Sequence, residues 1–299
     1  MDGGDALVVG EALVDVVVDG AGAVVERAGG SAANVAVALA RLERPVRFAS
    51  AWADDAYGAL VADHLRGSGV GLAGHPHVLE RTASAVARLQ ADGSARYEFD
   101  LDWRLGAVPT EPAPRVVHVC SLGAVLEPGA SSAVALVESL RATATVSYDV
   151  NARPSITGTG PDVVAQVERV VALADLVKLS DEDLASLWPD LEVDAAAARL
   201  LDLGASAVVV TRGGSGATWL DARGRVDVAS SPVEVADTIG AGDTFSAALV
   251  DGLWERGLLG GRLAVPQEEV AGLLAHAARA AAVTVSRPGA DPPWRGELG

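Results

Sequence analysis

Short apolar runs rich in valine alternate along the chain with longer segments whose apolar residues recur at helical spacing. The runs are continuous, which is typical of strands buried on both faces of a parallel sheet. The alternation predicts an α/β fold with a mostly parallel central sheet covered by helices on both faces. Predicted strands are 6–9, 46–51, 116–120, 145–149, 176–179 and 207–211, and predicted helices are 32–41, 56–67, 130–142, 162–172, 181–188, 194–203, 241–256 and 266–284.

Two segments break this pattern, because apolar and polar residues alternate in them with the period of a half-exposed strand. Residues 15–27 alternate around an Asp-Gly pair, and residues 85–100 alternate around an Ala-Asp-Gly turn. Each segment is predicted to form a β-hairpin with one face in water. No Pro/Ser-rich linker sets them apart, so we expect strands at about 12–28 and 84–102 to form a lid inserted into a single domain of residues 1–299.

The balance of charge is strongly acidic, since 40 Asp and Glu residues stand against 23 Lys and Arg residues and give a formal net charge of -17. A field of this sign repels phosphate backbones and no basic patch opposes it, so we expect no nucleic-acid partner. A hydrophobic fraction of 50% is enough for a large core. The one cysteine, Cys120, excludes an internal disulfide framework and a multi-cysteine zinc site.

Membrane insertion and export are not expected either. The most apolar windows, 163–177 and 264–285, are interrupted by charged residues or histidine. Their uninterrupted apolar lengths fall well short of the ~20 residues that a spanning helix needs. The chain starts with MDGGDALVVG, whose charges are acidic where a signal peptide would carry Lys or Arg. We therefore expect a cytoplasmic protein without a membrane partner.

The most specific motif is DTIGAGDTF at 237–245, which follows a strand-like stretch at 233–236 and opens a long alanine-rich helix. Small residues at 240–242 let backbone N–H groups approach an anion, and the start of a helix carries positive potential. Asp243 would lie in the first helical turn as a general base or as a cap. The alternative is a purely structural turn with an N-cap aspartate, because glycine-rich turns before helices are common.

A second motif, GGSAAN at 29–34, leads into the helix predicted from residue 32. Its paired glycines allow a tight turn at a helix N-terminus, and Asn34 offers both a donor and an acceptor to a polyol. Taken alone, the motif fits a loop with a helix cap as well as it fits a sugar site.

These motifs resemble the signatures of the ribokinase-like, pfkB-type carbohydrate kinases, and within that family most closely those of fructokinases. The resemblance covers nearly the whole chain in the family's order. It implies a ribokinase-like three-layer α/β/α sandwich with a small β-sheet lid, in an ATP-dependent sugar kinase. Further matching segments are GE at 10–11 with Asp15, SAWADDAYG at 50–58, SYDVNAR at 147–153, KLSDED at 178–183, TRG at 211–213 and SRPGA at 286–290.

The resemblance assigns roles in catalysis and in sugar binding. Asp243 would accept the proton of the sugar hydroxyl, and the backbone N–H groups of Gly240, Ala241 and Gly242 would form an anion hole for the phosphoryl group. Arg153 would contact the phosphates, with a surface ion pair as its alternative. The predicted sugar contacts are Asp15, Gly30, Ser31, Asn34 and, closing over the sugar, Trp103. The alternative place for this tryptophan is the core or its rim.

A second group of residues is assigned to ATP. It comprises Asn151, Lys178, Ser180, Asp183, Thr211, Gly213 and Gly216, with His276 near the adenine. Many relatives have NxxE where this chain has SDED at 180–183, so the last carboxylate is one methylene shorter. Either Asp183 or Glu182 would then order Mg²⁺ through water, and Mg²⁺ itself is expected because ATP phosphates carry it.

A monovalent cation, K⁺, is a further expected cofactor by the same resemblance. Its ligands beside the anion hole would come from Asp237, Ile239 and Gly289, with the carbonyl of Ala282 or Val283. The alternative is that these residues are ordinary strand and loop structure.

Competing functions are separated by motifs that the chain has or lacks. No GxGxxG follows the first strand and no GxxxxGK[ST] occurs, which argues against a dinucleotide enzyme and a Walker-type NTPase. Fructose, giving fructose 6-phosphate, is the first expected substrate, 2-keto-3-deoxygluconate the second, and another sugar or a nucleoside a further one. A sugar- or nucleotide-binding regulator should have lost Asp243 or the anion-hole glycines, and both are present. The resemblance also implies a homodimer formed through the lid.

Overall fold

The computed structural model describes residues 4–90, 95–230 and 232–299, and within them a nine-stranded sheet forms the centre of the body. Its strand order is β13-β12-β11-β10-β9-β8-β1-β4-β5, parallel except for the pairings of β12 with β11 and β13. The strands are β1 (Ala6–Val9), β4 (Val46–Ala49), β5 (Gly71–Leu72), β8 (Val116–Cys120), β9 (Thr145–Asp149), β10 (Leu176–Ser180), β11 (Ala207–Thr211), β12 (Ala217–Asp221) and β13 (Gly224–Val228).

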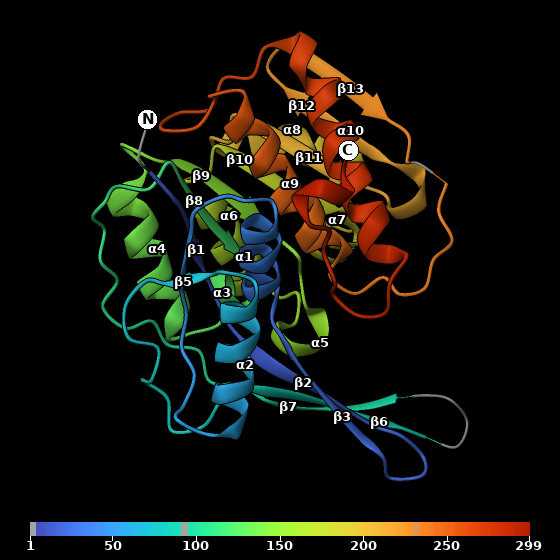
Figure 1. The fold of residues 1–299 in the computed structure, drawn as a ribbon. Coiled ribbons are helices and arrows are strands. Elements are labelled where there is room, and N and C mark those ends of the chain that lie inside the picture. Colours follow the sequence, from blue (N-terminus) through green and yellow to red (C-terminus); the bar gives the residue numbers. More distant parts are fainter. Residues whose placement is uncertain (1–3, 91–94, 231) are drawn as a thin grey trace.

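Helices cover both faces of this sheet. Successive side chains of each strand point to opposite faces, so each strand contributes to the core on both sides of the sheet. Ala6 and Val8 of β1 belong to the core cluster under α1 (Ser31–Arg41), α2 (Ala56–Gly67), α9 (Ala241–Glu255) and α10 (Gln267–Val285). Leu7 and Val9 belong to the opposite cluster, under α3 (Ser121–Val125), α4 (Gly129–Leu140), α6 (Pro161–Val171), α7 (Asp181–Leu187) and α8 (Val193–Leu203). The predicted three layers are confirmed (Figure 1). The short α5 (Pro154–Thr157) and two 3₁₀ turns, Gly213–Ser215 and Arg295–Glu297, complete the helical elements.

The lid is a separate four-stranded sheet that projects from the lower end of the body in Figure 1. Its strands are β2 (Leu13–Val18), β3 (Val24–Gly29), β6 (Ser84–Leu89) and β7 (Ala95–Asp100), in the order β3-β2-β6-β7. The two hairpins are antiparallel, and β2 and β6 join them in parallel. Both predicted hairpins therefore exist and form one sheet, although the predicted turn at 91–93 lies outside the described residues.

The strand-like stretch that precedes the DTIGAGDTF motif is not a strand. Residues 233–236 form a loop, in which Val233 and Val235 are 39% and 59% exposed. The loop crosses the end of α10, where the N–H groups of Ala236 and Asp237 donate to the carbonyl of Val285. The segment with the alternating valines therefore packs against the end of α10 and does not pair with a strand of the sheet. Two further parts of the sheet were not predicted: the antiparallel β12–β13 hairpin, which forms one edge, and the two-residue β5 at the other edge.

The parallel strands bring several segments to one edge of the body. Because β1, β8, β9 and β10 run in the same direction, their carboxyl ends lie together, on the side from which the lid projects. Residues that directly follow these strands therefore surround a common space. Across residues 4–90, 95–230 and 232–299, no helix combines the length and the apolar character needed to cross a bilayer.

Candidate functional site

Asp243 lies at the centre of the site, in the first turn of α9, and is 5% exposed. Its Oδ1 accepts a hydrogen bond from the Ser31 hydroxyl at 2.6 Å, and its Oδ2 accepts one from Asn34 Nδ2 at 2.8 Å. The Nδ2 of Asn151, which follows β9, lies 3.3 Å from Oδ1 and 2.9 Å from the Ser31 hydroxyl oxygen. Three polar side chains from two distant parts of the chain thus hold one carboxylate.

Opposing effects act on the protonation of Asp243. Burial raises the pKa of this carboxyl above its ordinary value of 3.8, and the nearby Asp149 charge adds to the rise. The hydrogen bonds from Ser31 and Asn34 and the Arg153 guanidinium lower the pKa, without cancelling the effect of burial. A carboxylate with a raised pKa is a better proton acceptor, which suits a general base.

The turn before Asp243 presents the N-terminus of α9. Gly240 has φ of +75°, and a Cβ on it would lie 2.6 Å from the Ala290 side chain. The turn is closed by a 3.3 Å bond from the Ala241 N–H to the Thr238 carbonyl. The first N–H groups of a helix have no acceptor within the helix, and they carry the positive end of its dipole. The start of α9 can therefore bind an anion.

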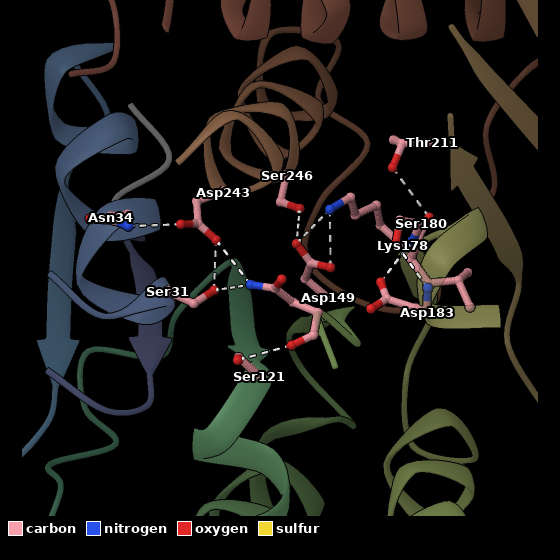
Figure 2. Close-up of polar contacts among 12 residues, drawn as sticks. Ser31, Asn34, Ser121, Asp149, Lys178, Ser180, Asp183, Thr211, Asp243 and Ser246 are labelled. Carbon is pink, nitrogen blue, oxygen red and sulfur yellow. Dashed lines mark hydrogen bonds and ion pairs between the residues drawn. The ribbon is translucent and has the colours of Figure 1, made fainter. Parts of the chain in front are cut away.

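A buried ion pair lies behind this turn. The Nζ of Lys178, on β10, is 2.9 Å and 3.2 Å from the carboxylate oxygens of Asp149, which also accept the Ser246 hydroxyl at 2.8 Å (Figure 2). Burial alone would lower the pKa of Lys178, but the Asp149 carboxylate outweighs burial and raises it, so the ammonium group stays charged. A Cβ on Gly242 would come 3.0 Å from Nζ. A positive charge therefore lies against the anion-binding turn.

A cavity of about 520 Å³, which we call the lid cavity, opens between this carboxylate and the lid. On its lid side it is lined by Val17, Ala85, Ala87, Tyr97 and Phe99, with the two aromatic rings stacked 6.0 Å apart. Its remaining lining includes predicted catalytic, sugar and nucleotide residues: Asp15 from the lid strand β2, and Gly30, Ser31, Asn34, Asn151, Arg153, Gly240, Gly242 and Asp243 from the body. The structure thus brings these nine predicted residues to one cavity.

A second cavity of about 260 Å³, the α10 cavity, lies on the other side of the anion-binding turn. Three predicted nucleotide residues, Thr211, Gly213 and Gly216, line it, and so does Ala241. Its remaining walls are apolar and come mainly from α10 and from loop residues: Val233, Val235, Phe245, Ala278, Ala281, Ala282 and Val285. Thr238 and Gly242 line both cavities. The two cavities therefore meet at the start of α9.

Ser180 and Asp183 form a capping box at the start of α7. The Asp183 Oδ2 accepts the Ser180 N–H at 2.8 Å, and the Ser180 hydroxyl accepts the Asp183 N–H at 3.0 Å. The Oδ1 of Asp183 accepts the Ala152 N–H at 2.8 Å, whereas Glu182 is exposed. Asp183 therefore joins α7 to the segment that carries Asn151 and Arg153.

The three predicted ligands of a monovalent cation also lie together. The Asp237 Oδ1 accepts the Ile239 N–H at 3.0 Å, and Oδ2 accepts the Gly289 N–H at 2.8 Å. Burial raises the pKa of Asp237, but these bonds outweigh it and lower the pKa below its ordinary value, so the carboxylate is ionised. An ionised carboxylate is a ligand that hard cations prefer, although both oxygens of this one accept backbone N–H groups. The Arg27 guanidinium lies beside it, since a Cβ on Gly289 would be 2.9 Å from Nη1.

Comparison with known proteins identifies the family to which this arrangement belongs. A family model described as pfkB family carbohydrate kinase matches residues 5–295. The chain belongs to this family. A fructokinase of Rhizobium leguminosarum bv. trifolii is 32% identical over 88% of this chain and 83% of its own length, and one of Klebsiella pneumoniae is 33% identical over 85% of this chain and 86% of its own. The protein is thus a carbohydrate kinase, a phosphotransferase that acts on a sugar hydroxyl.

Solved structures agree with this assignment. A fructokinase of Xylella fastidiosa with bound ATP is 25% identical, covers 98% of this kinase with 96% of its own chain, and superimposes with a TM-score of 0.83. A fructokinase double mutant of Vibrio cholerae O395, solved with fructose, ADP and a potassium ion, is 26% identical, covers 96% of this kinase with 94% of its own chain, and gives a TM-score of 0.80. The predicted ribokinase-like fold is therefore confirmed.

Trp103 and His276, predicted to lie over the sugar and near the adenine of the kinase, line neither cavity. Trp103 is 2% exposed, donates from Nε1 to the Gly123 carbonyl at 3.2 Å, and packs over Gly129, where a Cβ would come 2.3 Å from its ring. Trp103 is therefore a core residue and does not cover the lid cavity. His276 contacts Asp251 at 2.8 Å. Residues 278, 281, 282 and 285 share the helix face that lines the α10 cavity, and residue 276 is about 200° from the first of these, on another face.

Ser121, Asp149 and Glu11 had no predicted role but take part in the site of the kinase. Ser121 and Asn151 have φ of +48° and +36°, which is costly for residues other than glycine, and the Ser121 hydroxyl donates to the Asn151 carbonyl at 3.0 Å. Asp149 and Glu11 lay within matched motifs, but their roles depend on partners far along the chain. Apart from these motifs, the sequence signal that could have identified the two carboxylates was their position at or just after the end of an apolar strand.

Proposed function

We propose that the protein is a fructokinase, which transfers the γ-phosphoryl group of MgATP to fructose and forms fructose 6-phosphate. The observation that carries the proposal is the position of Asp243 and the anion-binding turn at the junction of two cavities. The lid cavity, which carries the Asp15, Asn34 and Asp243 side chains beside its aromatic wall, suits a sugar, and the apolar α10 cavity suits a nucleobase. The named relatives are fructokinases, which favours fructose over other sugars. We expect one kinase domain that acts in the cytoplasm, where ATP is available.

In the proposed reaction Asp243 acts as the general base. Fructose lies in the lid cavity, where Asp15 and Asn34 contact its hydroxyl groups. One hydroxyl oxygen attacks the γ-phosphorus, its proton passes to Asp243, and the bond from the γ-phosphorus to the β–γ bridging oxygen breaks, which releases ADP. Closure of the lid excludes water, which would otherwise compete with the sugar for the phosphoryl group.

Negative charge on the transferring group is stabilised at the start of α9. The N–H groups of the turn at 240–242 face the phosphoryl group, and the Lys178 ammonium adds positive potential from behind. Arg153 lies in the wall of the lid cavity and contacts the phosphates through its guanidinium. Asp183 or the exposed Glu182 would hold the Mg²⁺ that ATP carries, and the ion would supply positive charge to the phosphates.

The direct test is ADP release from MgATP in the presence of fructose, 2-keto-3-deoxygluconate, ribose or adenosine. We expect fructose to give the highest kcat/KM. A higher value for another acceptor would keep the kinase assignment and replace the substrate. Tight binding of sugar or nucleotide without turnover of any acceptor would instead support a regulatory protein.

A monovalent cation at Asp237 is part of the proposal. The supporting observation is the ionised Asp237 carboxylate beside Ile239 and Gly289, whereas the N–H groups that it accepts and the Arg27 charge oppose binding. KCl is expected to raise the thermal midpoint and the kcat above the values in choline chloride of equal ionic strength, because a ligand that binds only the folded state stabilises it. Equal values in the two salts would contradict a cation site.

We also propose that two copies of the chain associate through their lids. Strand register places Val17, Val25, Tyr97 and Phe99 on one face of the lid, and these residues are 39%, 49%, 60% and 39% exposed. An exposed apolar face of this kind is typical of an interface. A pair of lids packed face to face would cover it.

Replacing Tyr97 by glutamate is expected to convert the dimer to a monomer, because a buried unpaired charge at the interface is costly. The mass in solution is measured by light scattering after gel filtration. Val24→Glu is the matched control, since Val24 is 55% exposed on β3 but lies on the opposite face from Val25. A wild-type protein that is monomeric, or a Tyr97→Glu protein that remains dimeric, would contradict the proposed lid interface.

A further inference from the structure

Glu11 is a second buried carboxyl group in the lid cavity, and the reaction described above does not use it. It lies just after β1 and is 5% exposed. Its Oε1 accepts the N–H of Ser31 at 3.2 Å, and its Oε2 accepts the N–H of Gly123 at 2.8 Å. One carboxylate thus joins the first residue of α1 to the middle of α3, two elements on opposite faces of the sheet.

Ser31 connects Glu11 to the catalytic carboxylate. Its backbone N–H faces Glu11, while its hydroxyl donates to Asp243 at 2.6 Å and accepts from Asn151 at 2.9 Å. The residue before it, Gly30, has φ of +101°, and a Cβ there would come 2.7 Å from the Glu11 carbonyl oxygen. The start of α1 therefore contacts both the backbone of Glu11, through Gly30, and its side chain, through the Ser31 N–H.

We propose that Glu11 is a positioning residue: its ionised carboxylate fixes the start of α1 so that the Ser31 hydroxyl holds Asp243 in the orientation that accepts the sugar proton. The inference rests on the proposed function. Two N–H donors need two acceptor oxygens, and an ionised carboxylate supplies them. In a protonated carboxyl one oxygen carries hydrogen and accepts more weakly, so protonation would loosen one of the two contacts.

The surroundings of Glu11 place its change of protonation near neutral pH. Burial raises the pKa of Glu11 to about 7, against the lowering effects of its backbone hydrogen bonds and of Arg153. Asp243, on α9, raises the pKa further, and the Cys120 thiol at the end of β8 also interacts with Glu11.

The decisive variant is Glu11→Gln, which keeps the size of the side chain but removes its charge and one acceptor. We expect kcat with fructose at alkaline pH to fall about 10- to 100-fold, because small displacements of a reacting group cost this much. KM for ATP should stay the same. The acid limb of the pH–rate profile should move to lower pH, since glutamine does not titrate and the loss of activity caused by protonation of Glu11 disappears.

Asp175→Asn is the matched control. Asp175 directly precedes β10, at the edge of the sheet away from the site, and is 7% exposed. It also accepts two backbone N–H groups, from Val146 at 2.9 Å and from Leu263 at 3.4 Å, and burial raises its pKa. This variant loses the same kind of contact. It should leave kcat and the acid limb unchanged.

A stability measurement gives a readout besides activity. The folded-state pKa of Glu11 is raised from its ordinary value of 4.5 to about 7, so its ionisation destabilises the fold progressively as pH rises through this interval. The thermal midpoint of Glu11→Gln relative to wild type should therefore rise from about pH 5 to about pH 8. A constant difference over this range would contradict the proposed ionisation of Glu11.

Glu11→Asp provides a second variant if Glu11→Gln does not fold. It keeps the charge but is too short to reach both N–H groups, so kcat should fall while the acid limb stays in place. A Glu11→Gln or Glu11→Asp enzyme with wild-type kcat would overturn the positioning role. Absence of sugar-dependent turnover in the wild type would instead overturn the proposed function, so the two failures are distinguishable.

Discussion

Replacing Asp243 by asparagine is expected to lower sugar-dependent ADP formation by about 10²- to 10⁴-fold, the range that a general base contributes. The amide cannot accept the hydroxyl proton, although it has the size of the carboxylate and keeps an oxygen for the Ser31 hydroxyl. The fold should persist, since the change removes a charge whose burial is unfavourable. Turnover is measured at saturating MgATP and fructose, and folding is followed by thermal denaturation.

Asp202→Asn is the control for this variant, because Asp202 is exposed on α8 and outside both cavities. It should have wild-type turnover. As the pH is lowered, the wild-type rate should begin to fall at a higher pH than it would with an ordinary aspartate. The reason is that burial raises the pKa of Asp243 and only its ionised form accepts a proton. Near-wild-type turnover in Asp243→Asn would show that another group takes the proton.

Replacing Gly240 by alanine is expected to lower kcat by about 10²- to 10³-fold, the loss typical of a missing anion-hole donor. Gly240 has φ of +75°, and its added Cβ would lie 2.6 Å from the Ala290 Cβ and 2.9 Å from the Ala290 Cα. The turn must shift to relieve this contact. The N–H groups then no longer face the phosphoryl group. Steady-state kinetics with fructose and MgATP would measure the loss.

The left-handed backbone by itself costs alanine about 1–2 kcal/mol, so the kinetic effect has to be separated from lost stability. Gly257 offers a matched control at the other end of α9: its φ is +66°, and nothing lies within 4 Å of an added Cβ. Gly257→Ala should lose stability and keep wild-type kcat. If both variants lose kcat equally, the effect of Gly240→Ala is on stability and the anion-hole role is wrong.

Most elements of the body could be predicted from local pattern, because their apolar residues repeat at the spacing of the element and their ends carry local signals. The predicted helix at 56–67 agrees with α2 at both ends, where the Asp55 side chain accepts the Gly58 N–H as a cap. The central strands were predicted because both of their faces are buried, which leaves continuous apolar runs.

Segments whose structure depends on packing against neighbouring elements were predicted poorly from their apolar pattern. Val233 and Val235 alternate with polar residues as in a strand, but they belong to a loop beside α10. β13 is largely exposed or half-buried at the edge of the sheet, so it lacks the apolar run of a central strand. Burial of Trp103 and the turn of His276 toward α9 were likewise decided by packing, which residue type alone does not reveal.

Local residue patterns were enough to predict the family, the order of most strands and helices, and the residue types that the chemistry needs at the start of α9. Which of these residues meet depends on how the helices and strands pack. Ser31 and Asp243 are 212 positions apart and share a hydrogen bond, because parallel strands and the packing of α1 against α9 bring the two helix starts to one edge of the sheet. The raised pKa values of Asp243 and Glu11 have the same origin, since burial and neighbouring charge are properties of the packed molecule.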